Sequence, residues 1–311
     1  MEIQYNLLTP YLLAFGAALA PAPLFHLWLH WRCCVRAALP RPDKLLSGPG
    51  DSQRERIARL DGKITAAAVW LVSIPVGCIA AFLAPRLTGV TPLVGPDLYV
   101  LPGLALVLLL IPLFSLIGAC RERRSCLQKL AAELTVGREI NLLLRDGFQV
   151  FHDVPDDGGN LNHVVVGLSG VFVVESVGRP VPDLGGGLID AKVIYDGENL
   201  FFPPDNAKDG EAVRQARRQA VALERLLADG VGRPVAVRPA LALPGWFVER
   251  KRPDDLTLLY GQANHYARIL RGPTVFSPEQ ARQIGRVLEA RCRGVALDDL
   301  AGDGEGARGA S

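Results

Sequence analysis

Two long runs without a charged residue constrain this chain more than any other feature. Residues 65–84 read TAAAVWLVSIPVGCIAAFLA, and residues 98–120 read LYVLPGLALVLLLIPLFSLIGAC. At a rise of about 1.5 Å per residue, a helix of either length crosses a hydrocarbon core of about 30 Å. Their prolines are compatible with membrane helices, because neighbouring helices and water satisfy the freed carbonyls. The sequence therefore predicts a transmembrane helical hairpin over residues 65–120, rather than the buried hairpin of a globular core.

Basic residues flank this hairpin on both outer sides. They are Arg54, Arg56, Arg59 and Lys63 before the first run, and Arg121, Arg123, Arg124 and Lys129 after the second. The loop between the runs holds only Arg86. Because cytoplasmic flanks carry the excess of Lys and Arg, we expect both outer flanks to be cytoplasmic. The chain is thus predicted to be a multi-pass protein of the cell inner (cytoplasmic) membrane, with the lipid bilayer as its partner and a cytoplasmic soluble domain.

The first 38 residues form a further apolar segment with two interpretations. Residues 3–31 lack charge but contain Pro10, Pro21 and Pro23, and a basic stretch follows from Arg32. A first transmembrane helix with its N-terminus outside fits this pattern, and an interfacial helix fits it as well. In both cases residues 39–64 are expected to be a cytoplasmic linker.

Composition excludes several classes of function. Hydrophobic residues make up 49% of the chain and the formal net charge is +2, so no global field recruits nucleic acid. The six cysteines lack the paired spacing of a zinc site or a disulfide framework, and we interpret them as reduced thiols. Any contact with an anionic partner must therefore be local.

After residue 125 the pattern becomes that of a soluble α/β domain. Apolar spacing predicts helices over residues 127–144 and 211–228, and a capping box at Ser277-Pro278-Glu279-Gln280 begins a last helix that ends near Gly294. Strands are predicted over residues 148–154, 163–166, 170–175 and 235–243, together with an extended stretch over residues 191–202 that is broken by Asp196-Gly197. This order implies a mixed sheet flanked by helices over residues 125–295. The polar, Gly-rich tail, 296–311, is expected to be disordered.

Several motifs of this domain resemble the nuclease-related domain (NERD) family. They are Gly137-Arg138-Glu139-Ile140, Asn162-His163-Val164-Val165-Val166-Gly167, Gly170-Val171-Phe172-Val173-Val174-Glu175, Gln215-Ala216, and Ala242-Leu243-Pro244-Gly245-Trp246-Phe247-Val248. The match covers about residues 130–295, in the family's order. The resemblance implies a restriction-endonuclease-like fold. It also implies a site with a carboxylate on the first helix, an Asp on one strand and a Glu-X-Lys on the next.

Such a site hydrolyses phosphodiesters with Mg²⁺. The acidic groups hold the ion, the ion lowers the pKa of a water molecule, and the lysine orients or activates that water. On this resemblance Glu139, Glu175 and Gln215 form the catalytic set, and Glu175 and Asn162 are the metal ligands. Magnesium is expected as a cofactor only if the site is active, and no other cofactor is expected.

This sequence departs from the family pattern at two positions. Asn162 stands where the metal-binding Asp belongs, and Val177 stands where the lysine belongs. Losing a full charge next to the ion removes an interaction of roughly 4 kcal/mol at an effective dielectric constant of about 20. Each loss of about 1.4 kcal/mol in transition-state stabilisation slows the reaction about tenfold. The departures therefore predict little or no nuclease activity.

Three hypotheses follow. The leading one is a membrane-anchored NERD-like domain that has lost catalysis and binds nucleic acid or a protein partner. Its local basic cluster would be Arg214, Arg217, Arg218 and Arg225 on the second predicted helix. The second is an active, divergent nuclease in which Arg179 or Lys192 replaces the lysine. The third is a membrane assembly or scaffold protein in which the spans perform the function.

Overall fold

The computed structural model of the protein describes residues 46–88, 97–182, 191–261, 266 and 270–294. The predicted first apolar segment, residues 1–38, and the predicted tail, 296–311, lie outside the described residues. The chain divides into two compact units. One comprises residues 1–41 with 56–125, and the other comprises residues 42–55 with 126–311.

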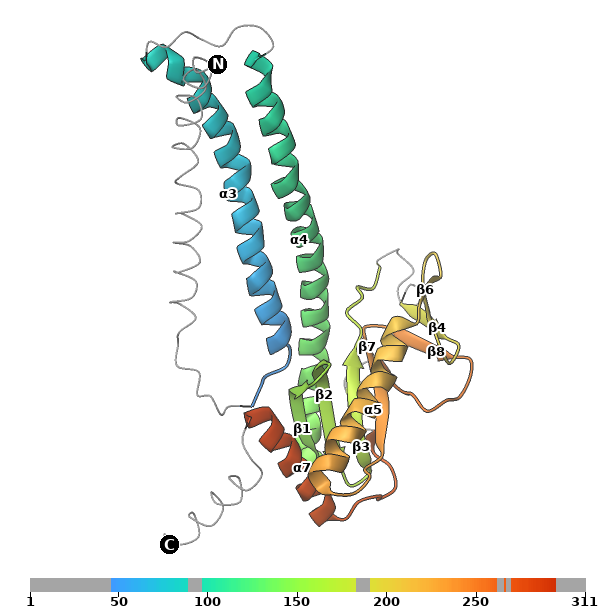
Figure 1. Ribbon diagram of the computed structural model, residues 1–311. Helices are drawn as coiled ribbons and strands as arrows, with labels where there is room; N and C mark the ends of the chain where they lie inside the picture. The colour runs from blue at the N-terminus through green and yellow to red at the C-terminus, as the bar shows by residue number, and fades with distance from the viewer. Residues whose placement is uncertain (1–45, 89–96, 183–190, 262–265, 267–269, 295–311) are drawn as a thin grey trace, which may run out of the picture. The chain divides into compact units, whose positions relative to one another are not determined.

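The first unit contains the two uncharged runs, each within a long helix. Helix α3 (Asp51–Thr88) carries the first run and α4 (Asp97–Asn141) carries the second (Figure 1). Both helices are long and apolar enough to cross a membrane, by length and composition. Beyond the apolar part, Arg56 pairs with Glu122 at 2.6 Å and Arg123 pairs with Asp61 at 2.5 Å, so charged residues tie the two helices together.

Helix α4 continues past the apolar run into the soluble domain without a break. The sequence pattern changes after Arg124, yet the same helix extends to Asn141. A short 3-10 helix, η1 (Leu142–Asp146), follows and ends at Gly147, whose φ of 82° lies in the left-handed region. Glycine adopts this conformation without steric cost, which explains why the predicted Asp146-Gly147 turn ends the helix.

A five-stranded mixed sheet forms the centre of the second unit. Its order is β1-β2-β3-β7-β9, with β1 to β3 antiparallel and β3, β7 and β9 parallel. The strands are β1 (Gln149–Asp156), β2 (Gly159–Gly167), β3 (Gly170–Ser176), β7 (Val237–Pro244) and β9 (Thr257–Gly261). The first four overlap the strand segments predicted over residues 148–154, 163–166, 170–175 and 235–243. The predicted mixed α/β domain is therefore observed.

Helices cover both faces of this sheet. Helix α5 (Glu211–Val231) and helix α7 (Pro278–Arg293) lie on one face (Figure 1), where their apolar stripes pack against Val164, Val166 and Val173. The end of α4 packs on the other face through Val136 and Ile140. Helix α7 begins with the predicted capping box, in which Ser277 and Gln280 exchange side-chain and backbone hydrogen bonds.

A second, smaller sheet extends the domain. Its order is β6-β5-β4-β8, built from β4 (Lys192–Tyr195), β5 (Leu200–Phe202), β6 (Ala207–Asp209) and β8 (Phe247–Arg250). Its core contains Tyr195, Phe202 and Trp246 and continues into the first half of α5. The extended stretch predicted over residues 191–202, with its break at Asp196-Gly197, corresponds to the two strands β4 and β5.

Candidate functional site

Three acidic residues from different elements gather where α4 meets the first sheet. Glu133 lies on α4, Asp153 on β1 and Glu175 near the end of β3. Glu133 and Asp153 are each only 2% exposed. The charges of Asp153 and Glu175 both act on Glu133. We call these three residues the acid cluster.

An unusual backbone conformation directs Asp153 into this cluster. Asp153 has a φ of 49°, which few residues other than glycine adopt. In a regular strand Phe151 and Val154 would face opposite sides, yet both pack in the core under α5 and α7. The reversal at Asp153 leaves two successive polar residues, His152 and Asp153, outside that apolar core. Strained positions of this kind concentrate at functional sites.

Burial raises the pKa values of two members of the cluster. The pKa of Glu133 rises to about 8, first through burial and then through the negative charges of Asp153 and Glu175. The pKa of Glu175 rises to about 7, mainly through burial, while a hydrogen bond from Gln219 and the charge of Lys129 oppose the rise. Acids with pKa values near neutrality hold or release a proton under physiological conditions, a property typical of functional sites.

Each acid forms hydrogen bonds with neutral groups. Gln219 of α5 donates to Oε2 of Glu175 at 2.7 Å. The backbone N–H of Ser52 donates to Oδ2 of Asp153 at 3.1 Å, and its hydroxyl donates to Oδ1 at 2.7 Å. Gln53 forms a side-chain hydrogen bond with Glu133. Ser52 and Gln53 stand at the start of α3, so residues far from the domain in sequence complete this site.

The segment carrying Ser52 and Gln53 fits closely against α4. We call residues 48–53 the docking segment. Pro49 packs on Gly137, where an added Cβ would lie 2.7 Å from Cβ of Pro49. Gly50, with a φ of 76°, sits beside Leu130 and Glu133 in the same way. Both contacts require glycine, and together they cover the acid cluster.

A buried histidine pair lies next to the cluster. Nδ1 of His152 and Nδ1 of His163 are 2.8 Å apart, and Nε2 of His152 is 3.0 Å from Oδ1 of Asn141. Burial lowers the pKa of His152 to about 4 and that of His163 to about 3, so both rings are neutral. If Nε2 of His152 donates to Asn141, its Nδ1 must accept from His163. Nε2 of His163 is then a buried acceptor, and it has no partner among the described residues.

The residues predicted from sequence fall in different places. Glu175 belongs to the acid cluster, whereas Glu139 lies near Tyr266, whose pKa is raised to about 12 by burial and by the charge of Glu139. Gln215 accepts a hydrogen bond from Arg218 at 2.7 Å, and the amide that reaches Glu175 comes from Gln219, one helical turn later. Glu133, rather than Glu139, is the helix carboxylate beside Glu175.

The two positions that depart from the family pattern also have defined surroundings. Asn162 lies on β2 between the pairs His152–His163 and Val154–Leu161, and hence opposite Asp153. The strand that pairs with β2 therefore supplies an acid next to the position where β2 lacks one. Val177 is 7% exposed and packs in the apolar core of the second sheet, with Ala191, Val193 and Trp246.

The cations proposed to replace the lysine are engaged elsewhere. The guanidinium of Arg179 lies 4.3 Å from the centre of the Phe202 ring, and Nζ of Lys192 pairs with Glu249 at 2.5 Å. Lys129 of α4 is a cation that sequence reasoning missed. Its charge lowers the pKa values of both Glu133 and Glu175, and its side chain is exposed. Its backbone touches Gly178, where an added Cβ would lie 2.6 Å away.

The predicted basic cluster on α5 is largely neutralised by acids. Arg214 and Arg218 both pair with Glu211, and Arg217 pairs with Asp254 at 2.9 Å and Asp255 at 3.0 Å. Within the described ranges, no three His, Cys, Asp or Glu side chains are close enough together to hold a metal ion. The hydrogen bonds to the acid cluster come from the side chains of Gln53 and Gln219 and from the hydroxyl and backbone N–H of Ser52.

Comparison with known proteins finds a family match for one part of the chain. Residues 128–244 match the family described as Nuclease-related domain, NERD. No curated protein and no solved structure matches the chain. The matched residues contain Lys129, the whole acid cluster and Gln219, whereas the docking segment lies outside the match. The chain thus carries a nuclease-related domain, and the resemblance of its motifs is confirmed.

Proposed function

We propose that this protein is a multi-pass membrane protein that presents a restriction-endonuclease-like NERD domain to the cytoplasm, where the domain binds nucleic acid without cleaving it efficiently. The observation that carries this proposal is the environment of Val177. The family pattern has a lysine at this position, but Val177 carries no charge and is packed among apolar side chains. The site thus lacks the group that activates water in this chemistry.

The state of the acids supports the same function. A metal ion needs deprotonated carboxylates, yet burial raises the pKa values of Glu133 and Glu175 to about 8 and about 7. Ser52 occupies both oxygens of Asp153. Magnesium binding would have to compete with these protons and hydrogen bonds. Among the described residues no three such side chains lie close enough together to hold a metal ion, so the acid cluster in this conformation does not fit Mg²⁺.

The apolar surfaces of α3 and α4 support the membrane anchor. Val72, Ile111 and Phe114 are 67%, 68% and 68% exposed, so the described protein does not cover them as it would cover a core helix. Such surfaces are stable in lipid. The basic flanks of the two runs favour a cytoplasmic location for the domain.

Restoring the missing groups tests the proposed function. The full chain in lipid nanodiscs is incubated with labelled DNA or RNA and Mg²⁺ or Mn²⁺. We expect the wild type to bind without cleaving, and the double variant Asn162→Asp, Val177→Lys to gain cleavage. Because Val177 is buried, Asn162→Asp, Val177→Met is the matched control for packing, and the unfolding midpoint of each variant is measured. Wild-type protein that fails to bind either nucleic acid would refute the proposal.

A specific observation favours a second candidate function, an active divergent nuclease. The charge of Lys129 reaches both Glu133 and Glu175, so this side chain is placed to substitute for the missing lysine. In that case wild-type protein would cleave, and Lys129→Gln would lose most of the activity. Lys251→Gln is a suitable control, because Lys251 pairs with Glu249 away from the cluster.

A further inference from the structure

Two adjoining hollows run along α7, away from the acid cluster. The first, of about 580 Å³, lies between the β2–β3 turn, the start of β1 and the first turn of α7. The second, of about 1170 Å³, follows the exposed side of α7 toward the end of α5. Gln149 and Arg282 line both, so the two hollows form one continuous surface. We call it the α7 surface.

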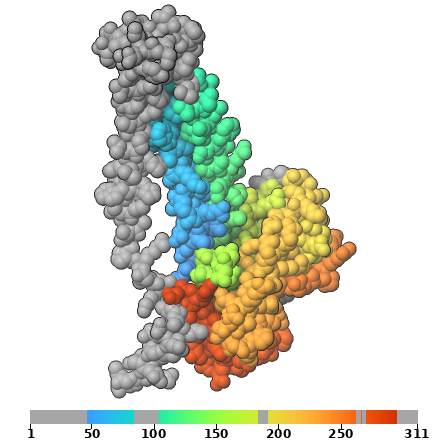
Figure 2. Space-filling view, in the orientation of Figure 1, coloured from blue at the N-terminus to red at the C-terminus, as the bar shows by residue number. Residues whose placement is uncertain are grey.

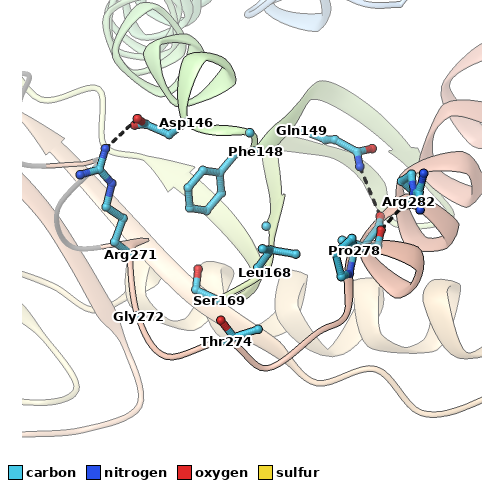
Figure 3. A pocket seen from close by; sticks show the side chains of 13 residues that line it. Asp146, Phe148, Gln149, Leu168, Ser169, Arg271, Gly272, Thr274, Pro278 and Arg282 are labelled. Atoms are coloured by element: carbon cyan, nitrogen blue, oxygen red, sulfur yellow. Dashed lines mark hydrogen bonds and ion pairs between the residues drawn. The ribbon is translucent and has the colours of Figure 1, made fainter.

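The first hollow has the groups that bind a phosphate. Figure 3 shows Arg271 and Arg282 on opposite sides, with Thr274 between them. Ser169 also lines the hollow, but its hydroxyl donates to the backbone carbonyl of Leu270 at 2.8 Å. Arg271 is held in place by Asp146 at 2.7 Å. The first turn of α7 also lines this hollow, and the N-terminal end of a helix carries positive partial charge.

The second hollow adds two more guanidinium groups, those of Arg233 and Arg286. Among the residues that the structure describes, no carboxylate pairs with Arg233, Arg282 or Arg286, and all three are exposed. Two acids line this hollow. Glu289 is paired with Arg293 at 2.7 Å. The negative charge of the other acid, Glu279, therefore stands against the positive charges of three arginines that line the same hollow.

The arginines on the neighbouring face of α5 differ from those of the α7 surface because they have acidic partners. Figure 2 shows the surfaces of α5 and α7 side by side. Both carry several arginines, but Arg214, Arg217 and Arg218 on α5 already have acidic partners. A phosphate on α5 would have to displace these carboxylates, whereas the arginines of the α7 surface keep their charge available.

We propose that the α7 surface binds the sugar–phosphate backbone of a nucleic acid. The proposal rests on the proposed function and locates its binding surface at a distance from the acid cluster. Three arginines without a carboxylate partner, interspersed with the amides of Gln280 and Gln283, match the donors that proteins direct at a phosphate backbone. The continuity of two hollows suits a polymer better than a single anion. Sequence readout is not implied, because such contacts fix position and affinity rather than sequence.

The test compares two arginine pairs on adjacent helices. Full-length protein in phosphatidylcholine nanodiscs is titrated with a short fluorescein-labelled DNA duplex and with a labelled RNA strand, and anisotropy is followed over a range of salt concentrations. The double variant Arg282→Gln, Arg286→Gln is expected to weaken binding by roughly tenfold or more and to reduce the log–log salt slope by about 2. The control Arg214→Gln, Arg218→Gln removes the same charge and is expected to leave binding within about twofold, because these arginines are already paired.

The outcomes separate this proposal from the proposed function. If both double variants weaken binding equally, the proposed function stands, because the wild type binds nucleic acid, but the assignment to the α7 surface is wrong. Absence of wild-type binding would overturn both. Anionic phosphatidylserine vesicles form a second arm. If Arg282→Gln, Arg286→Gln weakens binding of the protein to these vesicles but leaves DNA and RNA binding unchanged, the surface recognises lipid phosphates and the proposal is wrong.

Discussion

Two buried acids and two buried histidines give the folded state opposing pH dependences. The pKa values of Glu133 and Glu175 rise from 4.5 to about 8 and about 7, so the folded protein retains these protons to higher pH than the unfolded chain. Their contribution to stability is complete below about pH 4.5 and is lost as the pH rises through 7 and 8. The pKa values of His152 and His163 fall from 6.5 to about 4 and about 3. Their contribution is present above pH 6.5 and is lost as the pH falls through 4.

We therefore predict that the free energy of unfolding decreases from about pH 7 to about pH 8, where the acids dominate because the histidines of the unfolded chain are already mostly neutral. Each acid within its window contributes a slope of about 1.4 kcal/mol per pH unit. Glu133→Gln should flatten this slope, while Glu122→Gln, an exposed residue of α4, should preserve it. Denaturant unfolding of the full chain in detergent measures the slope. Equal slopes in the wild type and Glu133→Gln would show that Glu133 is not a buried titrating group.

The residues of this site differ in how far sequence predicts them. Glu175 is predictable because it ends an apolar strand within a recognisable motif. Glu133 lies on the same helical stripe as Val136 and Ile140, which is a signal of burial, but the family pattern favours Glu139 instead. Asp153 is not predictable, because the alternation of a regular strand would place its side chain on the same face as Phe151, in the apolar core. Its backbone is left-handed, and its carboxylate accepts hydrogen bonds from Ser52, a residue far away in the sequence.

At the scale of elements, local signals predict most of the fold and miss its long-range parts. The glycine turns at Gly147 and Gly170, and the capping box at Ser277, mark element ends correctly because their chemistry is local. Strand β8 has only four residues and pairs in parallel with β4, more than 50 residues earlier in the chain, so no local pattern identifies it. The docking segment is likewise invisible from sequence, because its partners lie on α4 and β1.

The fit of the docking segment gives a prediction at this scale. Gly137→Ala places a Cβ 2.7 Å from the rigid ring of Pro49, and overpacking of this kind costs about 1–3 kcal/mol. Gly62→Ala on α3 meets nothing within 4 Å and should be neutral or stabilising, since alanine favours a helix. We expect Gly137→Ala to accelerate hydrogen exchange at residues 48–53 and 150–154 in the intact protein. Unchanged exchange at both segments would contradict the docking role.

The whole molecule combines two units with different surfaces. The first carries exposed apolar side chains on α3 and α4, whereas the second packs apolar clusters around its sheets. The nuclease-related match covers only the second unit and the last part of the helix that enters it, residues 128–244. The helices that could cross a membrane by length and composition thus lie mainly outside the part of the chain that matches the nuclease-related domain.

Topology gives a prediction at the scale of the molecule. The basic flanks predict that the domain is cytoplasmic and that the loop around Arg86 faces the opposite side. In inverted membrane vesicles, a protease should degrade an epitope placed after residue 294, and in sealed spheroplasts it should leave that epitope intact. Degradation in spheroplasts alone would reverse the proposed orientation.

The central claim is that the domain binds nucleic acid and leaves it intact because Val177 stands in place of a lysine. The most direct measurement follows binding and cleavage in the same sample, with full-length wild-type protein in nanodiscs, labelled DNA or RNA, and Mn²⁺. We predict a bound fraction that rises with protein concentration while the bound strands remain full length. Metal-dependent cleavage by the wild type that disappears in Glu175→Gln would contradict the claim and identify an active nuclease.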